Sequence, residues 1–450
     1  LMEGGNAVDA AVAAGLMGAF SLQTMTGLGG GGIMTLRVDG EVQVLDCFSN
    51  LPGLGWEGPR PEPDEVQVPF EDVLETFQIG APTVAVPGVV AGLWEVHRRH
   101  GRMPMKALAA LVVEAARNGA EMTAAQNRSF TLLQGIWRRS PEAWALVGDE
   151  DGVLQVGQTI RNPDLATTLE HLVEEGPRAF YEGEIAKRIV EGTEGLVTAE
   201  DLATYEAVWR PPLDGTYRDA TIHMPGVPCL SGGMLFVALN ELDMGPPLPR
   251  RLEPDDWGRI ARALECGEAL RTPEYEERLF DQGWLEGLVA ASKSGNTLHC
   301  STIDDDGNAV AYTSSMGEGS ALVAPGTGIA LNNFLGEPDI VPRDGTNVAG
   351  RRMMTSMCPT IVERADGGCM SLGSAGSDRI RSAILQVLVR VIDGGRALQE
   401  AIGRPRIHTR DGVLYVEGYG RTPEQVEALR PYAKEVVATW APGFFFGGVQ

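Results

Sequence analysis

Thr297 and Ser315 are two hydroxyl residues whose spacing could bring them together for nucleophilic chemistry. The segments on either side of residues 304–308 are rich in β-formers, and residues 304–308 read Asp-Asp-Asp-Gly-Asn. A three-residue loop that ends with Gly307 in a left-handed conformation is a common hairpin connection. Such a hairpin is centred on Asp306 and places Thr297 directly opposite Ser315, with Cβ atoms about 4.5–5.5 Å apart. Two hydroxyls at that separation can share a hydrogen bond, although such pairs are also common in sheets without a catalytic role.

The acidic turn also allows another interpretation, a calcium site. Asp304 and Asp306 have the spacing of the first two ligands of a calcium loop, but the central ligands and the bidentate Glu are missing, so a hairpin turn is favoured. The six cysteines are scattered without a CxxC spacing, which is typical of reduced, buried thiols and not of a zinc site or a disulfide framework. We therefore expect no metal and no cofactor.

The region around Thr297 resembles the start of the small subunit in the γ-glutamyltranspeptidase family, where Thr-Thr-His comes first. Residues 296–299 read Asn-Thr-Leu-His, with Leu298 in place of the second Thr, and residues 306–310 read Asp-Gly-Asn-Ala-Val. Further motifs match the family in the same order along nearly the whole chain, at residues 4–12, 27–32, 86–88, 179–183, 196–205, 231–233, 328–333, 356–360, 373–380 and 405–408. Each motif is weak alone, and their shared order carries the resemblance.

Membership of this family implies a fold and a processing step. The fold class is α+β, a four-layer αββα sandwich of the N-terminal nucleophile hydrolase type, and the precursor cuts itself between Asn296 and Thr297. Residues 1–296 would form a large-subunit-like region and residues 297–450 a small-subunit-like region, intertwined in one catalytic domain. The new α-amine of Thr297, with an ordinary pKa near about 8, could then act as the base for its own hydroxyl. His299 is expected to be structural or positioning, not a base.

Other catalytic and binding roles are implied by the resemblance, position by position. Ser315 falls where a second hydroxyl orients the amine of the nucleophile. Gly376 and Ser377 fall where two adjacent glycines supply backbone N–H groups to the oxyanion, and Ser377 still has its N–H. Thr355 and Ser356 fall where a Ser-Ser pair binds a substrate carboxylate, and both positions keep a hydroxyl.

The acyl-binding positions depart from the family pattern. Asn333 falls on a substrate contact of the family, but Phe48 stands where an Arg clamps the γ-glutamyl carboxylate. Phe334 stands in place of a Gln, and Glu337 in place of an Asp that binds the substrate α-amine. These departures predict a more apolar acyl side on which Glu337 can still bind an amine.

A substitute for the missing clamp would have to come from another cation. Arg351 and Arg352 directly precede the Thr355-Ser356 pair and are the better-placed candidates, whereas Arg379 belongs to the family pattern and is expected to be structural.

The sequence thus favours an autoprocessing amidase that forms an acyl-enzyme on Thr297. It would transfer a γ-glutamyl or related acyl group from a small-molecule amide to water or an amine. One alternative is an acylase for a non-glutamyl, cephalosporin-type amide. Another is a non-catalytic family member that acts as a binding or structural protein.

Several elements would position these residues. Hydrophobic patterning predicts helices over residues 6–20, 89–100, 105–119, 163–174, 184–191, 257–290, 379–393 and 397–402, and residues 89–240 as a whole are expected to be mainly helical. Asp39-Gly40 is a hairpin signal within 33–48, Thr198 is an expected helix cap, and 413–417 is an expected strand.

Charge and composition limit which kinds of binding partner the protein can have. The net charge of −24 disfavours nucleic acid and anionic membranes, and the uncharged stretch 76–94 is broken by proline and glycine, so no membrane association is expected. The large and small fragments are expected to stay associated after cleavage, and homo-oligomerisation stays open. Both ends of the chain fall in mid-pattern, from which we expect truncation, so location in the cytoplasm or periplasm also stays open.

Overall fold

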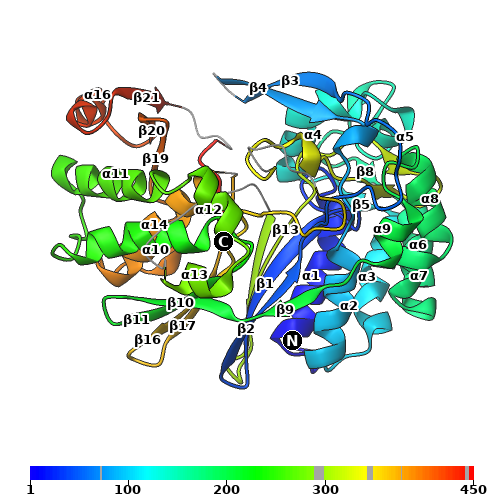
Figure 1. Ribbon diagram of the computed structural model, residues 1–450, viewed down its shortest axis with the longest axis horizontal. Coiled ribbons are helices and arrows are strands. Elements are labelled where there is room, and N and C mark those ends of the chain that lie inside the picture. Colours follow the sequence, from blue (N-terminus) through cyan, green and yellow to red (C-terminus); the bar gives the residue numbers. More distant parts are fainter. Residues whose placement is uncertain (71–72, 288–297, 342–347, 377, 441–444) are drawn as a thin grey trace.

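Two antiparallel β-sheets packed against each other form the centre of the molecule (Figure 1). The computed structural model describes residues 1–70, 73–287, 298–341, 348–376, 378–440 and 445–450. The first sheet has the order β12-β13-β1-β2-β9 and the second the order β10-β11-β16-β17. Their strands are β1 (Gly31–Val38), β2 (Glu41–Cys47), β9 (Val208–Arg210), β10 (Pro212–Tyr217), β11 (Ala220–Pro225), β12 (Leu298–Ile303), β13 (Ala309–Ser315), β16 (Thr360–Arg364) and β17 (Cys369–Leu372).

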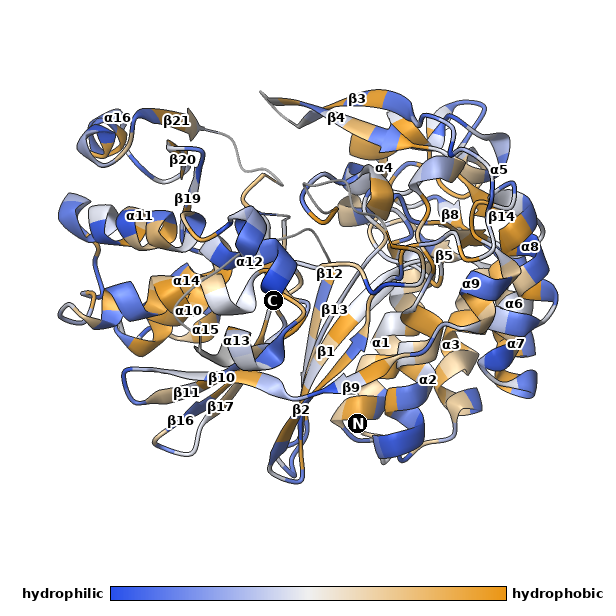
Figure 2. Ribbon diagram, in the orientation of Figure 1, coloured by the Kyte–Doolittle hydropathy of each residue, from blue (hydrophilic) through white to orange (hydrophobic). Residues whose placement is uncertain are grey.

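Helices cover the outer face of each sheet. One hydrophobic core joins the first sheet to α1 (Ala7–Ser21), α2 (Val89–His100) and α3 (Met105–Asn118). A second core joins the other sheet to α10 (Gly232–Asp243), α11 (Pro254–Glu268) and α14 (Arg379–Ile392), and α14 is buried over most of its length (Figure 2). Between the sheets, Ala309 and Ala311 pack against Ile361. The order helix, sheet, sheet, helix confirms the predicted αββα sandwich.

The remaining elements surround this sandwich. The helices are α4 (Ala124–Trp137), α5 (Pro141–Trp144), α6 (Pro163–Glu175), α7 (Arg178–Glu182), α8 (Glu184–Gly192), α9 (Ala199–Ala203), α12 (Pro273–Arg278), α13 (Gln282–Gly287), α15 (Leu398–Ile402) and α16 (Pro423–Glu427). The main additional strands are β3 (Asp64–Phe70), β4 (Val73–Ile79), β18 (Ser374–Ala375), β19 (Ile407–Arg410), β20 (Val413–Glu417), β21 (Glu435–Thr439) and β22 (Gly448–Val449). Short two-residue strands are β5 (Ala120–Glu121), β6 (Gly148–Asp149), β7 (Gly152–Val153), β8 (Thr159–Ile160), β14 (Val323–Ala324) and β15 (Ile329–Ala330).

Helix α1 starts at a capping box that ties it to the first sheet. Asn6 Oδ1 accepts from the Asp9 N–H, and Asp9 Oδ2 accepts from the Asn6 N–H, both at 3.0 Å. Asp304 Oδ2 accepts from the Ala7 N–H at 3.0 Å, and the Thr302 hydroxyl donates to Ala7 O at 2.7 Å. Asp304 therefore caps a helix as well as the hairpin turn, which gives its carboxylate a structural role.

The register of the predicted hairpin is confirmed over its described residues. Leu298 pairs with Ser314 and Ile303 with Ala309, so the hairpin is centred on residue 306. The Gly307 N–H donates to Asp304 O at 3.0 Å, and Gly307 has φ +80°, the left-handed conformation that the loop requires. The pairing of Thr297 with Ser315 stays a prediction, because residue 297 lies outside the described residues.

Several other expectations are confirmed. The Asp39-Gly40 turn joins β1 to β2, with both residues at positive φ, and Thr198 accepts from the Asp201 N–H at 3.0 Å at the start of α9. Patterning also placed several other elements to within two residues: helices α2, α3, α6, α8, α14 and α15 and strand β20.

The expectation of a mainly helical stretch over residues 89–240 is wrong for 208–225. That segment holds β9, β10 and β11, because Leu213, Ile222 and Met224 point into the second core and bury a sheet face there. The β3–β4 hairpin was not predicted, although Val66 and Val68 alternate with exposed Glu65 and Gln67. The stretch 257–290 contains three helices, α11, α12 and α13, in place of one.

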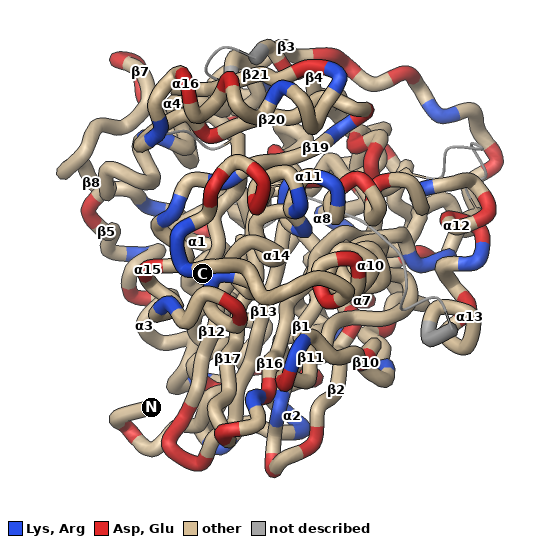
Figure 3. The backbone as a smooth tube through the Cα atoms, turned by 90° about the vertical axis from the view of Figure 1, so that its left-hand side faces the viewer, with Lys and Arg blue, Asp and Glu red and all other residues tan. Residues whose placement is uncertain are grey.

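Acidic residues are distributed over many elements and interspersed with Lys and Arg (Figure 3). None of the helices in the described parts of the chain combines the length and the apolar character needed to cross a membrane. Nor do the described residues include a group of three or more His, Cys, Asp and Glu side chains suited to a metal ion.

Candidate active site

Ser315 ends β13 at a point where the glycine run of residues 27–32 packs against it. Gly31 is its partner in β1, and a Cβ on Gly30 would lie 2.0 Å from Ser315 O. The run therefore serves close backbone packing. The side chain of Ser315 is buried, and its Oγ accepts from the Gly317 N–H at 2.8 Å.

His299 is held by hydroxyls on both ring nitrogens. The Ser301 hydroxyl donates to Ser371 O at 3.0 Å, so its contact with His299 Nε2 at 2.9 Å requires that Nε2 carries the proton. In the neutral ring Nδ1 then accepts from Thr313 Oγ1 at 2.7 Å. Burial lowers the pKa of His299 to about 3, so the ring stays neutral near pH 7. This network fits the expected positioning role, since neither nitrogen is left to take a proton from a nucleophile.

Gly376 lies in a turn between β18 and α14. It has φ +124°, and a Cβ there would lie 2.7 Å from Gly447 Cα, so the close approach of the 445–450 segment requires glycine. Ser377, the other predicted oxyanion residue, lies outside the described residues.

The carboxylate of Asp378 holds this turn in place through three side-chain partners. Its carboxylate accepts from His408 Nε2 at 3.1 Å and pairs with Arg379 at 2.8 Å and Arg410 at 3.6 Å. Burial opposes ionisation, but the surrounding His408, Arg379 and Arg410 hold the pKa of Asp378 well below its ordinary value. Burial also lowers the pKa of His408 to about 4, so its ring is neutral near pH 7.

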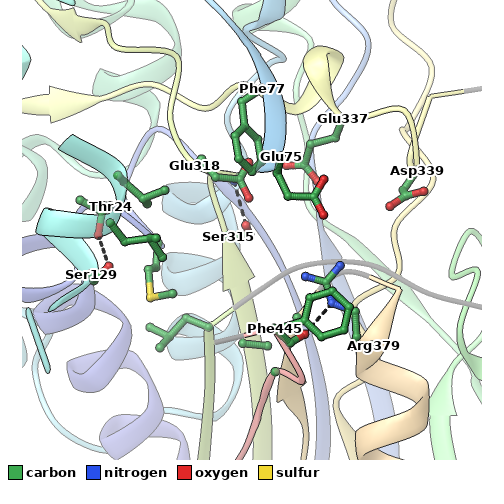
Figure 4. A pocket seen from close by; sticks show the side chains of 18 of the residues that line it. Thr24, Glu75, Phe77, Ser129, Ser315, Glu318, Glu337, Asp339, Arg379 and Phe445 are labelled. Atoms are coloured by element: carbon green, nitrogen blue, oxygen red, sulfur yellow. Dashed lines mark hydrogen bonds between the residues drawn. The ribbon is translucent and has the colours of Figure 1, made fainter. Parts of the chain in front are cut away.

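A cavity of about 550 Å³ brings Ser315, Gly376, Glu337 and His299 together. Figure 4 shows Ser315 between two groups of side chains, with Glu75, Glu318 and Glu337 to one side and Arg379 with Phe445 to the other. The predicted hydroxyl, oxyanion and amine-binding residues thus share one cavity, to which Glu75 on β4 and Arg410 on β19 also contribute.

The acidic side of the cavity, formed by Glu75, Glu318, Glu337 and Asp339, holds two buried carboxyls. Glu318 and Glu337 are 6% and 9% exposed. Burial raises the pKa of Glu318 to about 7, and burial together with the charge of Glu318 raises the pKa of Glu337 well above its ordinary value. Glu337 Oε1 has no hydrogen-bond partner among the described residues. A cationic group would satisfy its unmet hydrogen bond and would favour its ionised form.

Phe48 and Phe334 lie away from the cavity lining. Their rings are 4.8 Å apart, and both are buried in an apolar cluster with residues such as Ile33, Leu51 and Met357. The structure therefore seals the position of the missing Arg clamp with packed side chains. Sequence reasoning, which made these two Phe residues substrate contacts, did not anticipate that they would contact each other.

Asn333, Thr355 and Ser356 are also buried and lie outside the cavity lining. Asn333 Oδ1 accepts from the Glu318 N–H at 3.0 Å, and its amide donates to Gln78 O at 3.1 Å, so it links the Glu318 turn to β4. Thr355 Oγ1 accepts from the Met357 N–H at 3.2 Å.

The expectation that Arg351 or Arg352 supplies the substitute cation differs from what the structure shows. Arg352 pairs with Asp46 at 3.4 Å, donates to the Tyr205 hydroxyl at 2.6 Å and donates to Phe48 O. Arg351 stacks on Phe280 at 3.8 Å. Neither lines the cavity, whereas Arg379, expected to be structural, and Arg410 do.

The family model of gamma-glutamyltranspeptidase matches residues 1–272 and 268–450. The chain belongs to the γ-glutamyltranspeptidase family. Among relatives, the glutathione hydrolase proenzyme of Escherichia coli is 30% identical over 98% of this chain and 84% of its own length. The acylase ACY 1 proenzyme of Pseudomonas sp. strain SE83 is 30% identical over 93% of this chain and 81% of its own length.

Solved structures place the same architecture in this family. A cephalosporin acylase from Bacillus halodurans superposes with a TM-score of 0.80 at 21% identity and covers all of this chain and 89% of its own. At this level of identity, the similarity supports the fold alone. A gamma-glutamyltranspeptidase from Pseudomonas nitroreducens has a TM-score of 0.50 at 26% identity, covering 64% of this chain and 88% of its own. The predicted family, fold and enzyme class are confirmed.

Sequence reasoning missed Glu318 and Arg410. Glu318 lies three residues beyond Ser315, between two glycines, where a lone acidic residue at a strand end was a usable signal. Arg410 lies two residues beyond the 405–408 motif, but nothing in the sequence connects it with Asp378 or with the cavity.

Proposed function

We propose that this γ-glutamyltranspeptidase family member is an autoprocessing amidase that cuts itself between Asn296 and Thr297. It then forms an acyl-enzyme on Thr297. The observation that carries the proposal is the register of β12 and β13, in which Leu298 pairs with Ser314 beside the cavity residue Ser315. Continued by one residue, this register would place Thr297 opposite Ser315. The proenzyme names of the relatives support a precursor that is processed.

In the proposed reaction, the α-amine of Thr297 takes the proton of its own hydroxyl as the oxygen attacks the amide carbonyl. The N–H groups of Gly376 and Ser377 would stabilise the oxyanion, and the positive φ of Gly376 turns the backbone beside the cavity. The proton passes to the departing amine, and water or a second amine then releases the acyl group from Thr297. Ser315 would orient the α-amine.

The acyl donor is proposed to carry an ammonium group that Glu337 binds. Its unpartnered, buried carboxyl supports this choice, and it suits a γ-glutamyl or related amino-acyl group. Glutathione is expected to be a weak donor, because Phe48 and Phe334 close the position where the family has its carboxylate clamp.

A second candidate, an acylase for a non-glutamyl amide, is favoured by the same sealed pair of Phe residues. The identity to the acylase ACY 1 proenzyme, equal to that with the E. coli glutathione hydrolase proenzyme, supports keeping it.

The two fragments are proposed to stay associated after cleavage. β13 pairs with β1 over seven residues, so the strands of the 297–450 region and those of the 1–296 region are joined side by side within one sheet. Separating the fragments would break the centre of the first sheet.

One experiment tests the proposal. The mass of the purified protein and its N-terminal sequence report self-cleavage, and a panel of γ-glutamyl, aminoadipyl and glutaryl anilides reports turnover, in the wild type and in Thr297→Ala. We expect two fragments and aniline release only for the wild type. An intact wild-type chain that releases no aniline would instead support the non-catalytic alternative.

A further inference from the structure

The turn that carries Gly376 is flanked by an unbalanced group of charges. Asp378 is the single carboxylate that pairs with both Arg379 and Arg410, and the neutral His408 adds no charge. Two guanidinium groups therefore share one carboxylate, which leaves one net positive charge on this turn, and the charge of Glu75 on β4 also acts on Arg410. We call Asp378, Arg379 and Arg410 the arginine corner.

Within the arginine corner, Arg379 is already committed to the protein. Its Nη1 pairs with Asp378 at 2.8 Å, its Nε donates to Phe445 O at 2.8 Å, and its guanidinium lies 4.9 Å from the centroid of the Phe445 ring. The side chain is only 11% exposed. These contacts fix the turn against the 445–450 segment.

Arg410 is held more loosely and reaches the cavity from the end of β19. Its contact with Asp378 is 3.6 Å, beyond hydrogen-bonding distance, and its guanidinium interacts with Tyr415, whose ring centroid lies 5.5 Å away. Its side chain is 34% exposed. Of the two cations that line the described part of the cavity, Arg410 has more capacity for a ligand.

The opposite side of the cavity gives an anion no cationic partner among its described lining residues. Glu75, Glu318 and Glu337 face the space from there, so a carboxylate is favoured only near the arginine corner. The buried Arg352, by contrast, is neutralised by Asp46 and closed off from this space.

We propose that Arg410 binds a carboxylate of the amide substrate and thereby selects substrates that carry one. This rests on the proposed amidase function of the same cavity. The carboxylate could belong to the acyl half or to the leaving-amine half of the substrate, and the two sources are chemically separable.

Three chromogenic donors distinguish these sources. Butyryl 4-nitroanilide has no carboxylate, glutaryl 4-nitroanilide has one in the acyl half, and butyryl 3-carboxy-4-nitroanilide has one in the leaving half. We expect the wild type to prefer one carboxylate-bearing donor over the butyryl parent. Arg410→Gln should reduce that ratio of kcat/KM about 10- to 100-fold, the range expected for a hydrogen bond to a charged group.

Two further variants control for structure and charge. Arg410→Lys should keep part of the preference, because it retains the charge without the planar fork. Arg364→Gln removes one positive charge from β16, where Arg364 pairs with Asp366 at 3.1 Å outside the cavity lining, and should leave the ratio unchanged. A merely structural role of Arg410 would lower turnover of all three donors together. That result, or a wild type without any carboxylate preference, would overturn the proposal.

Binding without turnover separates this inference from the amidase function. Calorimetry with glutarate and with 5-amino-2-nitrobenzoate, the two carboxylate fragments of these donors, tests the wild type and Arg410→Gln directly. At least one should bind about 10-fold or more weakly to the variant. If no donor is cleaved but this difference is present, the amidase proposal fails and the carboxylate site stands. Equal binding of both probes to both proteins refutes the site.

Discussion

Two regions at the same end of the first sheet differ in how their charges are paired. Around Phe48, the buried Arg352 is matched by Asp46 and by the Tyr205 hydroxyl, and packed aromatic rings exclude solvent. Around Ser315, the cavity holds two carboxyls of raised pKa on one side and an excess guanidinium on the other. The first region satisfies its own charges, whereas the second leaves charges for a ligand. Phe48 and Phe334 therefore serve packing in this chain and do not line the cavity.

The largest expected effect comes from the nucleophile. Thr297→Ala should abolish self-cleavage and lower anilide turnover by at least about a thousandfold, because no other group can form the acyl-enzyme. Mass analysis and aniline release measure the two effects. Substantial turnover in an uncleaved variant would contradict the role of Thr297.

A change in the sealed region should affect folding more than recognition. Arg352→Met leaves the buried Asp46 with Arg210 as an ion-pair partner, at 2.8 Å, and with the Phe48 N–H as a hydrogen-bond donor, at 3.0 Å, and should lower the free energy of unfolding by about 3 kcal/mol. Denaturant unfolding in the Thr297→Ala background, where the chain stays in one piece, measures it. An unchanged stability with altered donor preference would instead make Arg352 a binding residue.

A change in the cavity should affect substrate recognition more than folding. Glu337→Gln removes the buried carboxyl without changing the size of the side chain, so stability should be kept or increased. The kcat/KM for γ-glutamyl anilide should fall about 10- to 100-fold relative to that for glutaryl anilide, which lacks the amine. Glu174→Gln, on the exposed face of α6, is the matched control and should change neither value.

A further effect concerns pH. The pKa of Glu318 is about 7 in the folded protein and about 4.3 in an unfolded chain, so the folded state binds more protons between these values. Stability should therefore fall as pH rises from about 4.3 to 7, at up to about 1.4 kcal/mol per pH unit from this group. Unfolding midpoints at pH 5 and pH 8 should differ less in Glu318→Gln than in its parent, with Thr297→Ala in both. Equal differences would exclude a raised pKa.

The sequence was sufficient where structure is local. The register of β12 and β13 follows from the loop with Gly307, and the start of α1 from the capping residues Asn6 and Asp9. The motif order then predicted the αββα layers. Contacts between distant segments were beyond such reasoning. Arg352 and Arg410 are both arginines near a motif, and only the fold shows that Asp46 neutralises one while the other shares Asp378 with Arg379.

β10 and β11 were missed for a related reason. Their apolar residues are compatible with helix or strand, and the partner β16, which lies more than 130 residues further along the chain, decides between them.

The hydrogen bonds that join Ala7 to Asp304 and Thr302 relate the folding of the chain to its proposed self-cleavage. They connect residues nearly 300 positions apart, and loop closures of that span are slow and late in folding. The contacts of Ala7 with the hairpin that follows the proposed scissile bond can therefore form only after this long closure. Self-cleavage would thus depend on complete folding. An incompletely folded or misfolded chain would keep its nucleophile blocked and would show no amidase activity.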